Sequence, residues 1–162
     1  MSESASKWIW EFSLRRRKTG ELAETGPLSC PERAADLCRS IDLHEREQEC
    51  LFAVILDTKN CLRGVHEVSR GLTDRASAHA REVYQVAVLM GASRVVLTHN
   101  HPSGDPTPSS ADIRVTHRLV EAGQIIGIEL VDHVVLGDPD RGKGWFLSMR
   151  AAGLWPASSR DF

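Results

Sequence analysis

The run T-H-N-H-P-S-G-D-P-T-P-S-S-A-D at positions 98–112 constrains this chain more than any other part of its sequence. The apolar, β-branched segment A-S-R-V-V-L just before it predicts a buried strand. Side chains two positions apart on a strand point to the same face, so His99 and His101 can aim at one point while Asn100 faces away. The prolines and the glycine that follow end the strand and turn the chain back. The Asp112 carboxylate can then reach the same point.

Two imidazoles and one carboxylate, with a fourth position open, form the ligand set of a catalytic zinc. His99, His101 and Asp112 are therefore the predicted metal ligands, and Zn²⁺ is the predicted cofactor. A simpler interpretation also exists, because Ser109-x-x-Asp112 before an apolar-periodic run is the pattern of a helix start. An isolated His-x-His pair is usually a surface or polar-core feature. The two interpretations of Ser109 and Asp112 are compatible, since a helix start is a rigid place to mount a ligand.

These residues match the JAMM motif of the JAB/MPN metalloprotease superfamily, H-x-H-x(7)-S-x-x-D. They resemble the RadC family more closely, because its H-N-H-P-S-G-x-x-x-P-S-x-x-D string is present at positions 99–112. The resemblance continues in A-R-E-V-Y (80–84), E-A-G-Q-I-I-G-I (121–128) and V-D-H-V-V-L-G (131–137), and covers roughly residues 29–154. It implies an α/β fold, with a mixed β-sheet flanked by helices and the metal at the end of a strand.

The resemblance also implies two catalytic residues. Family members use a glutamate just before the first core strand as general base and acid, eight residues before the aspartate of an L-D pair. Glu45, Glu47 and Glu49 are candidates, and counting back from Asp57 selects Glu49. Glu49 is also nearest to the apolar strand, where a side chain is most easily fixed and desolvated. Ser109 resembles the motif serine, whose hydroxyl contacts the water or the oxyanion; helix capping is an equally good interpretation.

Composition limits the class of protein. The chain has 162 residues, 41% of them hydrophobic, which predicts one globular domain with a sizeable core. A net charge of −2 argues against a mainly electrostatic nucleic-acid binder. No run is long enough to span a membrane and no signal peptide opens the chain, so we expect a cytoplasmic protein. Four scattered cysteines without C-x-x-C spacing predict reduced thiols.

The expected organisation is an N-terminal extension (1–28), a RadC-like JAB/MPN domain (29–154) and a C-terminal tail (155–162). In the extension, the W-I-W-E-F segment suggests an edge strand, and the R-R-R-K run at 15–18 is more often a solvated turn than a phosphate contact.

In the domain, the periodicity of apolar residues predicts the elements. They are a helix opened by a capping box at Ser29 and Glu32, strands at 51–56 and 61–69 joined by a turn, a helix at 77–90, the strand before His99, a helix at 110–122 stopped by Gly123, strands at 125–131 and 133–136, and a last strand or short helix at 145–150.

Five histidines lie outside the motif. His133, beside Asp132, is either close behind the metal ligands or a sheet-edge residue, and the second interpretation is favoured. The others show no ligand spacing and are expected to be structural or surface residues: His44, His66, His79 and His117.

Two functions follow. The first is a zinc-dependent metallopeptidase or isopeptidase that cuts a peptide or protein tail, with a ubiquitin-like protein as one candidate, and binds DNA weakly or not at all. The second is a non-catalytic DNA-repair or mobile-element accessory protein that binds DNA or a partner. The complete motif favours the enzyme, whereas the sequence does not indicate the natural substrate or an oligomeric state.

Overall fold

A five-stranded mixed sheet forms the centre of the molecule, in the order β2-β1-β3-β4-β5. The computed structural model describes residues 26–71, 78–138, 140 and 144–157. The strands are β1 (Cys50–Leu56), β2 (Leu62–Arg70), β3 (Arg94–Asn100), β4 (Glu129–Leu136) and β5 (Phe146–Ser148). Among the described strands, β3 and β4 alone run parallel to each other, and the other pairs are antiparallel. The prediction of an α/β fold with a mixed sheet is confirmed.

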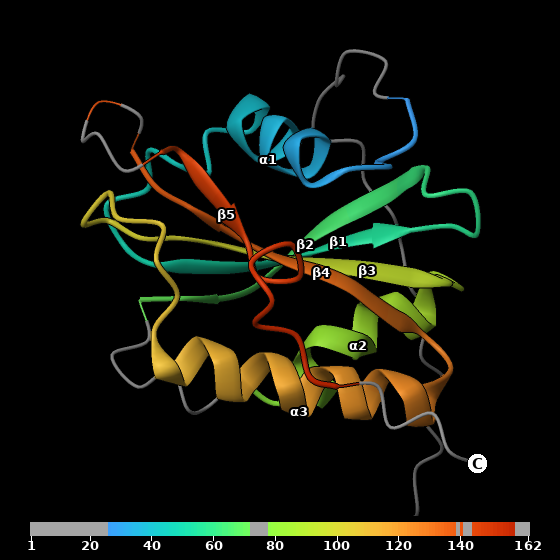
Figure 1. The fold of residues 1–162 in the computed structure, drawn as a ribbon. Coiled ribbons are helices and arrows are strands. Elements are labelled where there is room, and N and C mark those ends of the chain that lie inside the picture. The colour runs from blue at the N-terminus through green and yellow to red at the C-terminus, as the bar shows by residue number, and fades with distance from the viewer. Residues whose placement is uncertain (1–25, 72–77, 139, 141–143, 158–162) are drawn as a thin grey trace, which may run out of the picture.

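Helices cover both faces of this sheet (Figure 1). Helix α1 (Pro31–Ser40) lies on one face, while α2 (Ala80–Leu89) and α3 (Ser110–Ile126) lie on the other. Two apolar clusters fill the layers, one between α1 and the sheet and one between the sheet and the α2–α3 pair. Because both faces are covered, β1 and β3 are almost continuous runs of buried residues. No helix in the described ranges is long and apolar enough to cross a membrane.

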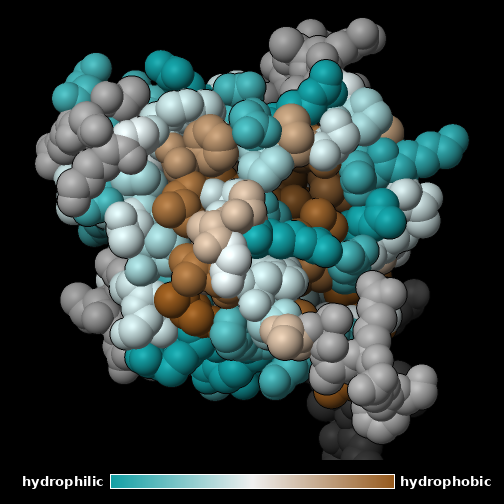
Figure 2. Space-filling view, viewed as in Figure 1, coloured by the Kyte–Doolittle hydropathy of each residue, from teal (hydrophilic) through white to brown (hydrophobic). Residues whose placement is uncertain are grey.

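Apolar surface gathers between α1 and the β4–β5 edge in the face shown in Figure 2. A cavity of about 300 Å³ opens there, with Leu28, Val96 and Val131 among its lining residues. Val96 faces α1, whereas its neighbours Val95 and Leu97 face α2 and α3, as the alternation along a strand requires. His99 is two residues after Leu97 and so points to the same face as Leu97. The hollow therefore lies on the opposite side of the sheet from His99.

Three local predictions were wrong. Helix α1 is capped by Cys30, without a side-chain hydrogen bond, rather than by a capping box at Ser29. The two strands predicted at 125–131 and 133–136 form one continuous strand, β4. It begins later than predicted, because residues up to Ile126 belong to α3. The helix also continues past Gly123 and ends at Ile126, where Gly127 caps it with a φ of 81°, the left-handed conformation that glycine tolerates best.

Gly123 is a packing residue inside α3. A Cβ atom there would lie 2.5 Å from the Tyr84 hydroxyl and 2.5 Å from the carbonyl oxygen of Ile128. Tyr84 of α2 is buried and donates a hydrogen bond to the carbonyl of Leu119, at 2.8 Å. Glycine at position 123 thus lets α2 and α3 approach each other closely enough to close the layer above the sheet.

The remaining elements agree with the sequence pattern. The turn between β1 and β2 closes with a hydrogen bond from the amide of Asn60 to the carbonyl of Asp57. The last predicted element is a strand, β5. All four cysteines are free thiols. The W-I-W-E-F segment and the R-R-R-K run lie outside the described residues.

Candidate metal centre

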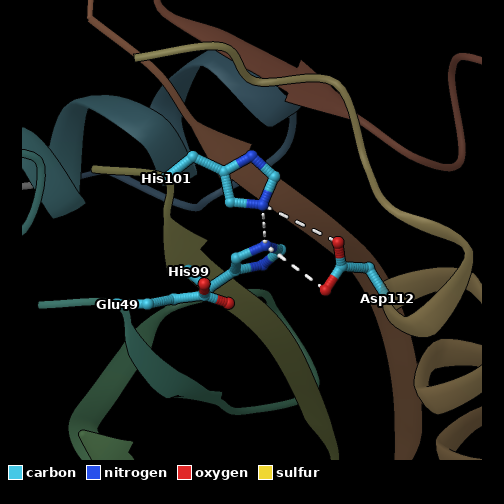
Figure 3. A group of neighbouring side chains, drawn as sticks. All are labelled: Glu49, His99, His101 and Asp112. Atoms are coloured by element: carbon cyan, nitrogen blue, oxygen red, sulfur yellow. Dashed lines mark hydrogen bonds and ion pairs between the residues drawn. The ribbon is translucent and has the colours of Figure 1, made fainter. Parts of the chain in front are cut away.

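Four side chains from three parts of the fold point toward one another at the end of β3 (Figure 3). His99 is near the end of β3 and His101 directly follows it. Asp112 is in the first turn of α3, and Glu49 directly precedes β1. Strands β1 and β3 are antiparallel neighbours, with Leu51 opposite His99, so the start of β1 lies beside the end of β3. The sheet register therefore brings Glu49 to the histidines.

The distances between these groups are short and the environment is mostly buried. The Nε2 atoms of His99 and His101 are 2.9 Å apart. Asp112 places Oδ1 at 3.6 Å from His99 Nε2 and Oδ2 at 3.7 Å from His101 Nε2. With Glu49 included, the potential ligand atoms all lie within 4.8 Å of one another. Both histidines and Asp112 are buried, and Glu49 is partly buried. The structure thus brings every predicted ligand together with the predicted base.

This arrangement fits a small divalent cation. In a tetrahedral zinc site with bonds of about 2.0–2.1 Å, neighbouring ligand atoms are about 3.3 Å apart. The three distances among His99, His101 and Asp112 lie on both sides of that value. Nitrogen donors with one carboxylate suit zinc, whereas calcium and magnesium prefer more oxygen ligands. The donor set and its spacing therefore agree with the predicted zinc ligands.

His101 is oriented by a main-chain carbonyl. Its Nδ1 is 2.7 Å from the oxygen of Asp105, and because a carbonyl only accepts, Nδ1 carries the proton. The lone pair of Nε2 is then directed into the site, as metal binding requires. Burial alone would lower the pKa of His101, but the Asp112 carboxylate and the Asp105 carbonyl outweigh it and raise the pKa above its ordinary value.

Asp112 is both a predicted ligand and part of a helix cap. The amide and the hydroxyl of Ser109 donate to Asp112 Oδ2 at 2.7 and 2.6 Å, and the amide of Asp112 donates to the Ser109 hydroxyl. Burial alone would raise the pKa of Asp112, but His101, His99 and Ser109 together hold it well below its usual range. The interpretation of Ser109 as helix cap is confirmed, and the same hydroxyl fixes one carboxylate oxygen of Asp112.

Loop 101–109 is fastened to the end of β4. The amide of His101 donates to Leu136 and the amide of Asp138 donates to Gly104, both at 2.9 Å. A Cβ atom on Gly137 would lie 2.6 Å from the Gly104 oxygen and 2.7 Å from Pro106, so glycine is needed for this close approach. The loop that carries Asp105 is thereby held in register with the strand beside the site.

Asn100 faces away from the ligands, as predicted, and holds the segment that carries Glu49. Its Oδ1 accepts from the amide of Cys50 at 2.9 Å. Its Nδ2 donates to the carbonyls of Gln48 and Arg46 at 3.2 and 3.0 Å. Two of these three hydrogen bonds are to the residues on either side of Glu49, so one buried amide fixes the main chain around it.

We expect Asn100→Ala to lower the free energy of unfolding by about 1–3 kcal/mol, because buried main-chain groups lose their partner. Turnover should fall as well, since the main chain around Glu49 loses its attachment, while zinc content stays the same. Thermal unfolding, elemental analysis and a rate assay on one preparation separate these effects. Turnover equal to that of the unaltered chain would show that Asn100 acts on stability alone.

His133 lies behind His99, and its prediction as a sheet-edge residue was wrong. It sits in β4 opposite Leu97 of β3 and is only 1% exposed. Its Nε2 is 2.7 Å from His99 Nδ1, and its Nδ1 is 2.6 Å from the hydroxyl of Thr116. Burial lowers the pKa of His133 to about 4, so the ring is neutral near pH 7.

Sequence reasoning overlooked Thr116 and placed His133 wrongly, although both leave a signal. Asp132 and His133 are polar residues within an apolar run, a combination that seldom occurs in a strand without a specific partner. Thr116 is four residues after Asp112 and so shares its helix face. The four other histidines are partly or fully exposed, and none joins the ligand group: His44, His66, His79 and His117.

Comparison with known proteins agrees with this geometry. A family model of the RadC-like JAB domain matches residues 28–154. A UPF0758 protein of Desulforamulus reducens is 41% identical over 146 residues, which are 88% of this chain and 61% of the relative. One from Desulforudis audaxviator is 39% identical over 145 residues, 89% of this chain and 60% of the relative. One from Moorella thermoacetica is 46% identical over 108 residues, 67% of this chain and 45% of the relative.

The chain thus spans about 60% of the length of the first two relatives. The family match covers all four residues of the candidate centre and every described helix and strand. The chain belongs to the RadC-like JAB domain family.

Proposed function

We propose that this chain is a zinc-dependent metallopeptidase or isopeptidase, with His99, His101 and Asp112 as metal ligands and Glu49 as general base. The observation that carries the proposal is the convergence of these four side chains within 4.8 Å at the end of β3. Burying two imidazoles and a carboxylate at one point costs free energy unless they are paired or bind a cation. A purely structural domain has no need of a second carboxylate at the same point.

Each residue then has a separate task. A bound zinc would supply Lewis acidity, lowering the pKa of a coordinated water to about 7 and polarising the scissile carbonyl. Glu49 accepts the proton of the attacking water and returns it to the leaving amine. A cavity of about 40 Å³, enough for a few water molecules, lies next to the ligands and is lined by Glu49, His99 and Asp112 among others.

An extended peptide or protein tail is the proposed substrate. Strand β2 is an edge strand of the described sheet. Its Ser69 lines the same cavity as Glu49. An extended chain can add to such an edge through main-chain hydrogen bonds, and the narrow cavity favours small side chains. The flexible tail of a ubiquitin-like protein has these properties, whereas a DNA duplex does not.

The Ser109 hydroxyl has one proton, which it donates to Asp112 Oδ2 in this structure. Ser109→Ala should lower turnover by about a hundredfold to a thousandfold if that proton turns to the developing oxyanion during the reaction. Zinc content should hardly change, because Ser109 is not a ligand and its amide still donates to Asp112 Oδ2 in the variant. Ser109→Thr keeps the hydroxyl, and Ser110→Ala removes an exposed neighbouring hydroxyl, so both serve as controls. A loss of about 1 kcal/mol in stability with unchanged turnover would mean that Ser109 acts only as the helix cap.

A peptide library and labelled DNA, assayed with one zinc-loaded preparation, test the proposal. We expect cleavage of exposed peptide or isopeptide tails, inhibition by zinc chelators, and only weak, salt-sensitive binding to DNA. The non-catalytic alternative predicts DNA or partner binding and no cleavage of either substrate. Zinc-dependent DNA cleavage that Glu49→Gln removes, with every peptide intact, would overturn the peptidase assignment.

A further inference from the structure

A chain of buried hydrogen bonds connects two of the proposed metal ligands on the side away from the metal. It leads from His99 Nδ1 to His133 Nε2 (2.7 Å) and from His133 Nδ1 to Thr116 Oγ1 (2.6 Å). From Thr116 Oγ1 it reaches the carbonyl oxygen of Asp112 at 2.7 Å. Thr116 is fully buried, and His99 and His133 are each 1% exposed, so water does not compete for these bonds.

One arrangement of protons satisfies every link and also leaves His99 Nε2 free to bind a metal. The carbonyl of Asp112 can only accept, so the Thr116 hydroxyl donates to it and offers its lone pairs to His133. The sulfur of Met149, 3.5 Å from the same hydroxyl, is a much weaker acceptor. His133 then donates from Nδ1 to Thr116, and with its Nε2 as acceptor the proton of the last link is on His99 Nδ1.

The reverse arrangement breaks one link and leaves His99 unable to bind a metal through Nε2. If the Thr116 hydroxyl donated to His133, the Thr116 and Asp112 oxygens would lie 2.7 Å apart with no proton between them. His133 would then donate to His99, whose proton would move to Nε2 and point at the Nε2 of His101, 2.9 Å away. A protonated Nε2 has no lone pair with which to bind a metal.

We propose that His133 and Thr116 are positioning residues, which hold His99 as the tautomer protonated on Nδ1 and thereby direct the Nε2 lone pair at the metal. The inference rests on the proposed metal site and assigns its supporting groups. Asp105 performs the same task for His101 through its carbonyl. Both histidine ligands therefore receive a preset tautomer, one from a loop and one from the neighbouring strand and helix.

Zinc affinity of the full chain, measured by competition with a coloured chelator, tests the inference. His133→Leu should weaken zinc binding by about 10–100-fold, the usual effect of losing a group that orients a ligand. His133→Gln keeps an acceptor for His99 and should recover part of the affinity. Thr116→Val should weaken binding by about tenfold, at the low end of that range, and Thr116→Ser should not.

Thr98→Val is the matched control for Thr116→Val. Thr98 is also fully buried, but it lies beside Cys38 of α1, on the other face of the sheet. Its substitution should change stability without changing zinc affinity. If His133→Leu does not fold, the two Thr116 variants still decide the question. Thr116→Val removes the hydroxyl from the chain of hydrogen bonds, whereas Thr116→Ser keeps it.

A second readout is independent of activity and of affinity. In ¹⁵N spectra of the zinc-loaded protein, the proton of His99 should be on Nδ1 and coupled across the hydrogen bond to His133 Nε2. Equal zinc affinity in His133→Leu, Thr116→Val and the unaltered chain would overturn this inference alone. A proton on His99 Nε2 in the zinc-loaded protein would overturn it together with the assignment of His99 as a ligand. Failure of the unaltered chain to bind zinc would overturn it together with the metal site.

Discussion

Glu49→Gln should lower the rate of hydrolysis by about a hundredfold to ten-thousandfold, the range that a positioned general base contributes. Gln has nearly the shape of Glu but cannot take the proton from water. The three proposed metal ligands come from β3, the residue after it and α3, whereas Glu49 directly precedes β1 and is proposed to act on water rather than to bind the metal. The substitution should therefore leave zinc in place.

Parallel elemental analysis and rate measurement on Glu49→Gln separate the two roles that a carboxylate can have here. Glu47→Gln is the matched control, because Glu47 is an exposed glutamate two residues earlier that does not belong to the ligand group. Loss of zinc from Glu49→Gln would make Glu49 a ligand, and the division of tasks proposed here would be wrong.

His99→Ala should abolish both zinc binding and hydrolysis, which is a larger change than that of Glu49→Gln. The variant removes one of three ligands and also leaves His133 Nε2 without the partner that it has at 2.7 Å. His117→Ala is the control, since His117 is on α3 but outside the ligand group. Retention of one tightly bound zinc by His99→Ala would show that the metal is held elsewhere.

The grouping of His99, His101 and Asp112 was predictable because it depends on local geometry. The i, i+2 spacing of His99 and His101 on one strand and the position of Asp112 in the first helical turn are both properties of short segments. Glu49 was harder, because three glutamates precede β1, and only its closeness to the apolar run and the resemblance selected it. The structure places Glu49 in the ligand group and leaves Glu45 and Glu47 exposed.

The residues that support the site depend on tertiary contacts, which short-range patterns do not encode. Asn100 acts on a segment about 50 residues earlier in the chain, through the pairing of β1 with β3. His133 was misplaced because the predicted break at position 132 put it at the start of a short strand rather than inside β4. Gly123 carries an ordinary helix-stop signal, but its contact with Tyr84 overrides that signal.

Zinc content is the most direct test of the central claim that His99, His101 and Asp112 form a metal centre. Protein purified without chelators should contain about one zinc per chain by elemental analysis. Asp112→Asn should lose most of it, because the amide replaces a negatively charged ligand. Absence of zinc from the unaltered chain, with none taken up when zinc is added, would contradict the metal centre and the hydrolytic function built on it.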